Sequence, residues 1–239
     1  MTEILSIVPN KGKKLEIEFD GQKYLRLPIK TPLLSEKTDL AETIRKYAGP
    51  YLKPGDLLFV SEKVVCVTQG RIINMNDVKP TKLARLLARR VRTGYGTANF
   101  RGFGHSTPQA MQLFIDEAGI PRVLFATAIA ALTRPLGIKG AFYLICGKMA
   151  KSVDCPMSFA ILEYAHYAKL APKDPDGVAR KLKAEFGNET VILDANYIGA
   201  FSLGKSTRAL SEKFIGKLFR DNPLGQADEM TPICIVRKA

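Results

Sequence analysis

Residues 54–65 read Pro54-Gly-Asp-Leu-Leu-Phe-Val-Ser-Glu-Lys-Val-Val65, a turn followed by two short apolar runs. The first run, Leu57–Val60, has the length and composition of a buried strand. Ser61-Glu-Lys63 interrupts the apolar pattern before it resumes, and Gln69-Gly-Arg71 ends it. We therefore predict a buried strand that leads into a short loop and then into a second element.

The chain on either side of this stretch alternates between strand-like and helix-like patterns. Polar-apolar alternation at 14–19 and 23–27, across the turn Asp20-Gly21, predicts a β-hairpin. Other segments predict helices at 38–48, 82–92, 107–117, 158–169, 174–186 and 207–219, and strands at 141–146, 190–193 and 232–236. This alternation predicts a mixed α/β fold, with mixed sheets flanked by helices. We expect one unit over residues 1–239, with the hairpin as an N-terminal extension within residues 1–29.

The formal net charge of +13 is the strongest signal in the composition. Such a charge suits a polyanionic partner or a small anionic substrate. Its one local cluster, Lys82–Arg92, keeps apolar residues at helical spacing, so its arginines form the solvated face of a helix. The chain has no basic motif with interleaved aromatic residues, so we do not expect nucleic acid to be the partner.

The cysteines and the apolar runs indicate the compartment. Cys66, Cys146, Cys155 and Cys234 form no C-x-x-C pair, so we expect four buried thiols in a reducing environment. The longest apolar runs are too short or too interrupted to span a bilayer, and the first residues do not resemble a signal peptide. We predict a cytoplasmic protein that has no membrane partner.

The segment Gly199-Ala-Phe-Ser-Leu-Gly-Lys-Ser206 matches the phosphate-binding pattern G-x-x-x-x-G-K-[ST] letter by letter. A phosphate-binding loop needs a strand that leads directly into it and a helix that leaves it. Five residues separate Gly199 from the predicted strand, so we do not predict such a loop. Lys205 is kept as a candidate phosphate contact by another geometry. His105, in a glycine-rich stretch, is a candidate substrate contact.

Carboxylates at the ends of predicted strands are candidate metal ligands. Asp194 follows the predicted strand Val191–Leu193, and Asp154 is a second candidate of this kind. Ligands gather at the carboxyl ends of strands in α/β sheets, and two carboxylates from separate loops can bind one Mg²⁺ or Mn²⁺. Each carboxylate taken singly is also compatible with a helix cap or a turn.

Four segments carry motifs that occur together in one family: Lys30-Thr-Pro-Leu-Leu34; residues 54–71; Pro172–Gly177 with Val191–Asn196; and Leu224-Gly-Gln-Ala-Asp-Glu229 with Pro232–Arg237. In this order they resemble the motifs of the coenzyme F-420-0:L-glutamate ligases, also called γ-glutamyl ligases. The last segment is the most specific, because it is similar to the family ending G-Q-A-D-E-G-I-P-V-V-x-x-R.

The resemblance implies a homodimer with the γ-glutamyl ligase-like α/β fold. It also implies a ligase that uses GTP or ATP and a divalent metal, Mn²⁺ or Mg²⁺, to join glutamate to a phosphorylated deazaflavin. The implied metal ligands are Asp194, Gln226 and Asp154. The implied nucleotide contacts are Pro32, Leu33, Leu34 and Lys63. The resemblance names no catalytic residue on this chain.

Three positions depart from the family pattern. Cys66 and Val67 stand where the family has serine and lysine, and Ala195 stands where it has threonine after the metal-binding aspartate. The primary hypothesis is that the protein is a metal-dependent ligase that adds a glutamate-like amino acid to an acidic acceptor. The alternative is a non-catalytic relative that binds a nucleotide or an acidic metabolite. A third reading, a basic nucleic-acid-binding protein, would require salt-sensitive affinity for RNA or DNA.

Overall fold

A computed structural model describes residues 7–90, 106–138, 140–155, 161–196, 199–225 and 227–239. The chain forms two compact units, which are described separately here. The first, the sheet unit, comprises Met1–Gly70 and Pro172–Ala239, and the second, the helical unit, comprises Arg71–Ala171. The expectation that residues 1–239 act as one unit of the family type stays a prediction.

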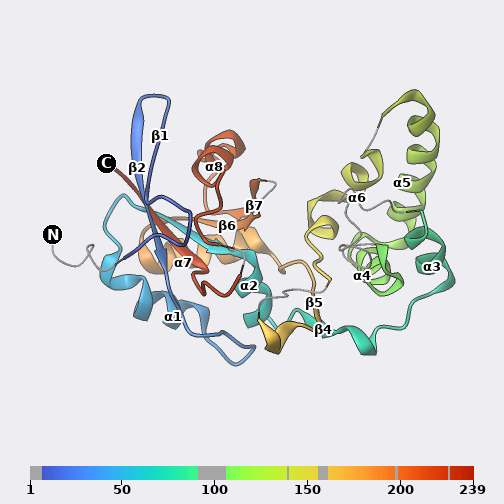
Figure 1. Cartoon of the computed structure of the whole chain (residues 1–239), viewed down its shortest axis with the longest axis horizontal. Coiled ribbons are helices and arrows are strands. Elements are labelled where there is room, and N and C mark those ends of the chain that lie inside the picture. The colour runs from blue at the N-terminus through green and yellow to red at the C-terminus, as the bar shows by residue number, and fades with distance from the viewer. Residues whose placement is uncertain (1–6, 91–105, 139, 156–160, 197–198, 226) are drawn as a thin grey trace. The chain divides into compact units, whose positions relative to one another are not determined.

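The sheet unit contains a six-stranded mixed sheet in the order β1-β2-β8-β3-β6-β7 (Figure 1). Its strands are β1 Glu16–Phe19, β2 Gln22–Ile29, β3 Leu57–Ser61, β6 Glu189–Ala195, β7 Ala200–Lys205 and β8 Ile233–Lys238. Of the neighbouring pairs, β3 and β6 run parallel, whereas the other pairs run antiparallel. The predicted hairpin is confirmed, and through the pairing of β2 with β8 it forms an edge of this sheet.

Helices cover both faces of this sheet. They are α1 Leu40–Tyr47, α2 Glu62–Thr68, α7 Pro175–Phe186, α8 Glu212–Leu218 and the short 3-10 helix Gly49–Tyr51. Residues alternate between the faces along each strand, so Leu58 and Val60 pack with Ile44 of α1 and Leu182 of α7. Phe59 faces the other way and packs with residues of α8. The predicted mixed α/β class is confirmed.

Local sequence signals explain two of these helices. Asp39 precedes α1, and its side chain accepts a hydrogen bond from the backbone N–H of Glu42 at 2.9 Å. Asp174 caps α7 in the same way, from Gly177 at 3.0 Å, with Pro175 at the first helical position. Side-chain caps satisfy donors that lack an intrahelical partner, which is why these starts were predicted from the sequence.

The helical unit contains four α-helices, a two-stranded sheet and short 3-10 helices among its described residues. The elements are β4 Ile72–Asn74, α3 Lys82–Ala88, α4 Pro108–Ala118, α5 Ile120–Thr133, α6 Ala141–Lys151 and β5 Tyr167–Lys169, with 3-10 helices Met75–Asp77, Arg134–Leu136 and Leu162–Tyr164. The helices pack around one apolar cluster that includes Met111, Phe114 and Val123. The basic helix predicted at 82–92 is confirmed over Lys82–Ala88.

Two predictions in this unit and one in the sheet unit are corrected. Residues 141–146, predicted as a strand, form the first part of α6, because a short apolar run does not distinguish a strand from a buried helix. Residues 167–169, predicted as helical, form β5, which pairs with β4; His166, expected within that helix, lies in the preceding turn and is exposed. The helix predicted at 207–219 is confirmed only over Glu212–Leu218, because Ser211 caps its start.

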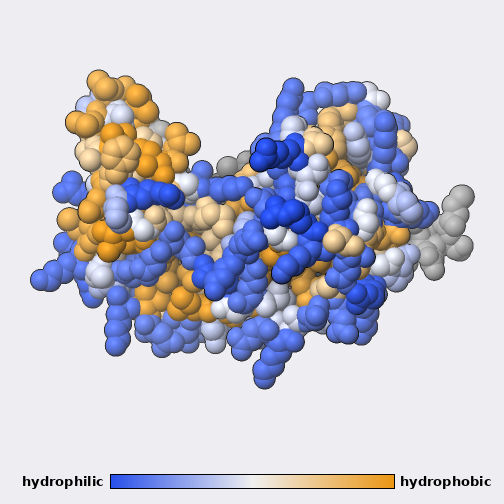
Figure 2. Space-filling model, turned by 180° about the vertical axis from the view of Figure 1, so that it is seen from behind, coloured by the Kyte–Doolittle hydropathy of each residue, from blue (hydrophilic) through white to orange (hydrophobic). Residues whose placement is uncertain are grey.

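The helical unit exposes much of its apolar surface. In α5 only Val123 and Ala126 are buried, whereas Leu124, Phe125 and Leu132 are 51%, 60% and 69% exposed. Figure 2 shows apolar surface over this part of the unit. Contiguous apolar surface on a protein usually marks an interaction site.

Within the described part of the chain, no helix combines the length and the hydropathy needed to cross a bilayer.

A buried arginine joins the sheet to the segment between α8 and β8. Arg26 of β2 is 1% exposed, and its Nη1 donates to the backbone oxygen of Leu218 at 2.8 Å while both terminal nitrogens contact the carboxylate of Asp221. Burial alone would raise the pKa of Asp221, but the hydrogen bonds and the charge of Arg26 outweigh it and hold that pKa below its ordinary value. The start of the Asp221–Thr231 segment is therefore fixed to β2.

We predict that Arg26→Met lowers the free energy of unfolding by about 2 kcal/mol, because hydrogen bonds between charged groups are lost in a buried setting. Arg45→Met is the matched control, since Arg45 pairs with Glu185 but its side chain is 59% exposed. Exposed pairs contribute less than about 1 kcal/mol. Urea unfolding of both variants measures the difference, and equal losses would contradict this role for Arg26.

Candidate functional site

Four strands of the sheet unit meet at one edge of the sheet, by which we mean the edge formed by strand ends and not by an outermost strand. Ile29 at the end of β2 pairs with Ile233 at the start of β8, and Ile233 also pairs with Val60 of β3. Val60 in turn lies beside Ile192 of β6, one residue before Ser61 pairs with Leu193. At this end of the strands, three segments begin, namely those that follow β2, β3 and β6. The segment that precedes β8 ends there.

These segments together form what we call the site edge: Thr31–Leu34, Glu62–Lys63, Asp194–Asn196, and the described part of the segment before β8, Asn222–Gly225 with Ala227–Thr231. Two backbone hydrogen bonds tie them together. Thr31 N–H donates to the oxygen of Met230 at 2.9 Å, and Ser61 N–H donates to the oxygen of Pro232 at 2.8 Å. The structure thus brings four predicted nucleotide contacts, Pro32, Leu33, Leu34 and Lys63, to the same edge as Asp194.

Asp194 lies near the carboxyl end of β6, opposite Phe201 of β7, and is partly buried. Beyond the strand, Asn196 N–H donates to Gly199 oxygen at 2.9 Å and Gly199 N–H donates to Asn196 Oδ1 at 3.2 Å. Asp194 thus lies near the carboxyl end of a strand, as expected, and its role as a metal ligand stays a prediction. Gln226 and His105, two further predicted site residues, lie outside the described residues.

The segment Asn222–Thr231 is held by its own polar groups. The Glu229 carboxylate accepts a hydrogen bond from Ala227 N–H at 2.6 Å and lies over Gly225, whose φ is +77°. A Cβ on Gly225 would lie 2.3 Å from Cδ of Glu229, so a larger residue would displace this carboxylate, and the positive φ also favours glycine. Thr231 Oγ1 donates to Leu224 oxygen at 2.7 Å and accepts from Asn10 Nδ2 at 2.7 Å. These contacts hold the described residues on either side of position 226.

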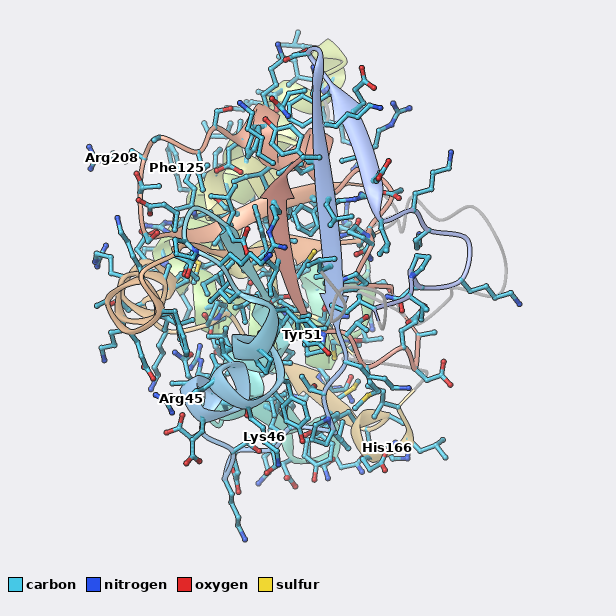
Figure 3. The ribbon with its side chains drawn as sticks, turned by 90° about the vertical axis from the view of Figure 1, so that its left-hand side faces the viewer. Arg45, Lys46, Tyr51, Phe125, His166 and Arg208 are labelled. Carbon is cyan, nitrogen blue, oxygen red and sulfur yellow. The ribbon has the colours of Figure 1, made fainter. Side chains whose placement is uncertain are left out.

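A surface pocket of about 600 Å³ lies beside the first of these segments. It is lined by residues of the loop before α1 and of α1 itself: Pro32, Leu33, Leu34, Lys37, Thr38, Asp39, Glu42, Thr43, Arg45, Lys46 and Tyr47. Three of the predicted nucleotide contacts therefore line a pocket that also has three cationic side chains. Figure 3 shows two of them, Arg45 and Lys46, next to each other on the outer side of α1. No motif in the sequence marks these cations.

Two of the three departures from the family pattern lie in α2 and are buried. Cys66 is fully buried, and its thiol lies 3.6 Å from Oε2 of Glu62, which is itself 1% exposed. Val67 is 4% exposed and belongs to the apolar core. The positions where the family has a serine and a second lysine therefore serve packing here. Lys63 stays partly exposed.

Asp154 lies in the other unit. Its backbone forms an isolated β-bridge with Lys169, and its carboxylate lies 3.9 Å from the fully buried ammonium group of Lys169. This ammonium would compete with a metal ion for the carboxylate. Because each unit is described by itself, the joint action of Asp154 and Asp194 at one metal stays a prediction.

Lys205 is placed away from Asp194. It ends β7 beside Val191, at the other end of the β6–β7 pairing, and its Nζ donates to Glu212 at 2.9 Å and to Leu210 oxygen at 2.8 Å. The segment that matches the phosphate-loop pattern is the strand β7, which explains why it does not form such a loop. Ser206, the last letter of the pattern, donates to Glu189 at 2.5 Å.

The cysteines match the sequence-based expectation. All four are free and buried. Burial raises the pKa of the Cys155 and Cys234 thiols to about 12, so both are protonated at neutral pH. Within the described ranges, no group of three or more His, Cys, Asp and Glu side chains is arranged to hold a metal ion. A metal site at the site edge would therefore need ligands of other residue types or ligands from outside the described ranges.

Comparison with known proteins agrees with the geometry. The sequence model of the F420-0:Gamma-glutamyl ligase family matches residues 28–213 of this chain of 239 residues. The match extends from the end of β2 through the helical unit to the start of α8, and so includes the site edge up to Asn196. The chain therefore belongs to the F420-0:γ-glutamyl ligase family, a family of ligases in the biosynthesis of coenzyme F420. No curated protein matches the sequence.

We predict that Gly204→Ala destabilises the protein by at least about 1 kcal/mol, because overpacking costs this much in a close contact. A Cβ at Gly204 would lie 2.2 Å from the backbone of Pro175, where α7 packs on β7. At Gly199, the first glycine of the phosphate-loop pattern, a Cβ would meet nothing within 4 Å. Thermal unfolding should therefore separate Gly204→Ala from Gly199→Ala, and similar midpoints would argue against a packing role for Gly204.

Proposed function

We propose that this protein is a nucleotide- and metal-dependent ligase that forms an amide between a glutamate-like amino acid and an acidic acceptor. The observation that carries the proposal is the common position of Pro32, Leu33, Leu34, Lys63 and Asp194 at one edge of the sheet. Membership of the ligase family gives the reaction class. The substrates, the nucleotide and the metal are part of the proposal.

The pocket beside α1 supports the proposal that the protein binds a nucleotide or another anionic ligand. Its lining holds three cations, Lys37, Arg45 and Lys46, and two carboxylates, Asp39 and Glu42. Asp39 caps α1 and Arg45 pairs with Glu185, so Lys37 and Lys46 are the cations proposed to contact a phosphate-bearing ligand. The apolar part of the pocket comes from Leu33 and Leu34, which would contact the base or the sugar. GTP is the proposed nucleotide because of the resemblance, and ATP is the alternative.

The predicted metal ligands fit Mg²⁺ or Mn²⁺ in kind, since Asp194, Asp154 and Gln226 all offer oxygen atoms. The position of Asp194 near the carboxyl end of β6 supports its part in this proposal, and Gln226 lies outside the described residues. A bound divalent ion would neutralise phosphate charge at the site edge. The ligand set is completed only by residues outside the sheet unit or outside the described ranges, so a specific coordination geometry is not proposed.

The proposed reaction converts a carboxylate of one substrate into a leaving group. The γ-phosphoryl group of the nucleotide is transferred to a carboxylate oxygen, which releases the nucleoside diphosphate and gives an acyl phosphate. The amine of the second substrate then attacks the acyl carbon, so that the amide forms and inorganic phosphate leaves with the loss of a proton. Lys37 and Lys46 in the pocket lining would stabilise the negative charge of these groups.

One observation favours a second candidate, a relative that binds a nucleotide or an acidic metabolite without catalysis. Cys66 and Val67 occupy the positions of the family's serine and second lysine and are buried in α2. If those family side chains are needed for turnover, their replacement would leave binding and remove catalysis. Amide formation from labelled glutamate in the presence of GTP and Mn²⁺ distinguishes the two candidates.

We predict that GTP with Mn²⁺ raises the melting temperature of the protein, because a ligand that binds only the folded state stabilises it by mass action. Asp194→Asn should abolish the part of the shift that requires metal, while the unliganded variant keeps its circular dichroism spectrum. Asp154→Asn is the comparison, and the position of Asp154 beside Lys169 predicts a smaller effect.

The result for Asp194→Asn decides the role of this residue. An unchanged metal-dependent shift in that variant would remove Asp194 from the site. The absence of any shift in the wild-type protein, with GTP or ATP and with Mg²⁺ or Mn²⁺, would contradict the proposed nucleotide and metal dependence.

The protein is proposed to act as a homodimer, as the resemblance implies. The exposed apolar side chains of α5 support this, because a second copy would remove them from water. We predict that the double substitution Leu124→Glu and Phe125→Glu gives a monomer in light scattering. Leu162→Glu, at an exposed leucine outside α5 and α6, is the control, and an unchanged mass for both variants would exclude α5 from the interface.

A further inference from the structure

A single buried amide connects two segments of the site edge. Asn222 is 2% exposed and lies between α8 and β8. Its Nδ2 donates to the backbone oxygen of Ala195 at 3.3 Å and to the backbone oxygen of Gly225 at 2.8 Å. The first acceptor directly follows Asp194, and the second begins the turn that Glu229 stabilises. One side chain therefore joins the end of β6 to the segment before β8.

We infer that Asn222 is a positioning residue, which sets the end of β6, and with it the carboxylate of Asp194, relative to Gly225. The inference rests on the proposed function, because it assigns a purpose to this placement at a metal and nucleotide site. Groups that orient a ligand-binding side chain without touching the ligand commonly change metal affinity by about 10–100-fold.

The local chemistry of Asn222 explains why asparagine occupies this position. Its backbone has a φ of +46°, a left-handed conformation that asparagine and glycine adopt most readily. Its Oδ1 is buried and has no hydrogen-bond partner among the described residues. A buried oxygen without a partner costs free energy, and glycine would satisfy the backbone without that cost. What asparagine adds at this position is the pair of donated hydrogen bonds.

The chain supplies a matched control at the other end of the same strand. Asn188 is 4% exposed and immediately precedes β6. Its Nδ2 also donates to two backbone oxygens, those of Lys53 and Asp56, both at 2.9 Å. The two asparagines thus have the same burial and the same donor pattern, but only Asn222 lies at the site edge.

The test compares Asn222→Asp with Asn188→Asp in the full chain. Aspartate keeps the size of the side chain but replaces the donating nitrogen with an oxygen that repels both backbone carbonyls. Titration with Mn²⁺ in the presence of GTP should show at least about a tenfold loss of affinity in Asn222→Asp, and no comparable loss in Asn188→Asp. Equal affinities in the two variants would overturn the inference. Asn222→Gly, which keeps the backbone conformation, replaces Asn222→Asp if the aspartate variant does not fold.

Hydrogen exchange tests the same placement without any ligand. Asn222→Asp should increase amide exchange in residues 194–196 and 224–231, whereas Asn188→Asp should increase it around residues 53–56. Unchanged exchange at the site edge in Asn222→Asp would overturn the inference even if the wild-type protein binds metal. If the wild-type protein binds neither metal nor nucleotide, the proposed function fails, and the exchange result alone decides whether Asn222 fixes these segments.

Discussion

The parallel pairing of β3 with β6 is the constraint on which the site depends. Parallel neighbours end at the same edge of a sheet, so the pairing places the residues after Ser61 beside those after Leu193. The antiparallel strand β8 lies against β3 on the other side and begins at this edge, and β2 ends beside the start of β8. Four segments that are far apart in the sequence are therefore collected at one edge by backbone hydrogen bonds. The buried contact between Arg26 and Asp221 then fixes the start of the longest of these segments.

Much of the sheet unit could be predicted from the sequence, because its signals are local. The apolar run Leu57–Val60, the strand before Asp194 and the terminal strand are short, buried and bounded by turns, and Asp39 and Asp174 cap their helices through hydrogen bonds within three residues. The helical unit was harder to predict. Residues 141–146 have an apolar composition that suits both a strand and a buried helix, and tertiary packing in the helical cluster decides for the helix.

The candidate site was predictable in part. Asp194 follows a recognisable strand, and the contacts near residues 32–34 and 63 came from motif resemblance. Asn222, Glu62 and the cations of the pocket gave no such signal. Asn222 acts through Ala195, 27 positions away, and its role is visible only when the ends of β6 and β8 are placed together. The match of Gly199–Ser206 to a phosphate-loop pattern is a sequence signal without the corresponding structure. Its second glycine is explained by the contact of β7 with Pro175.

The central claim is that this edge of the sheet holds the metal and the nucleotide. Crystals of the protein grown with GTP and Mn²⁺ test it most directly, through the anomalous scattering of manganese. The account predicts a manganese peak within about 2–2.5 Å of a carboxylate oxygen of Asp194, with density for the nucleotide beside Pro32–Leu34. A manganese peak bound elsewhere, with the surroundings of Asp194 free of metal and nucleotide, would contradict the account.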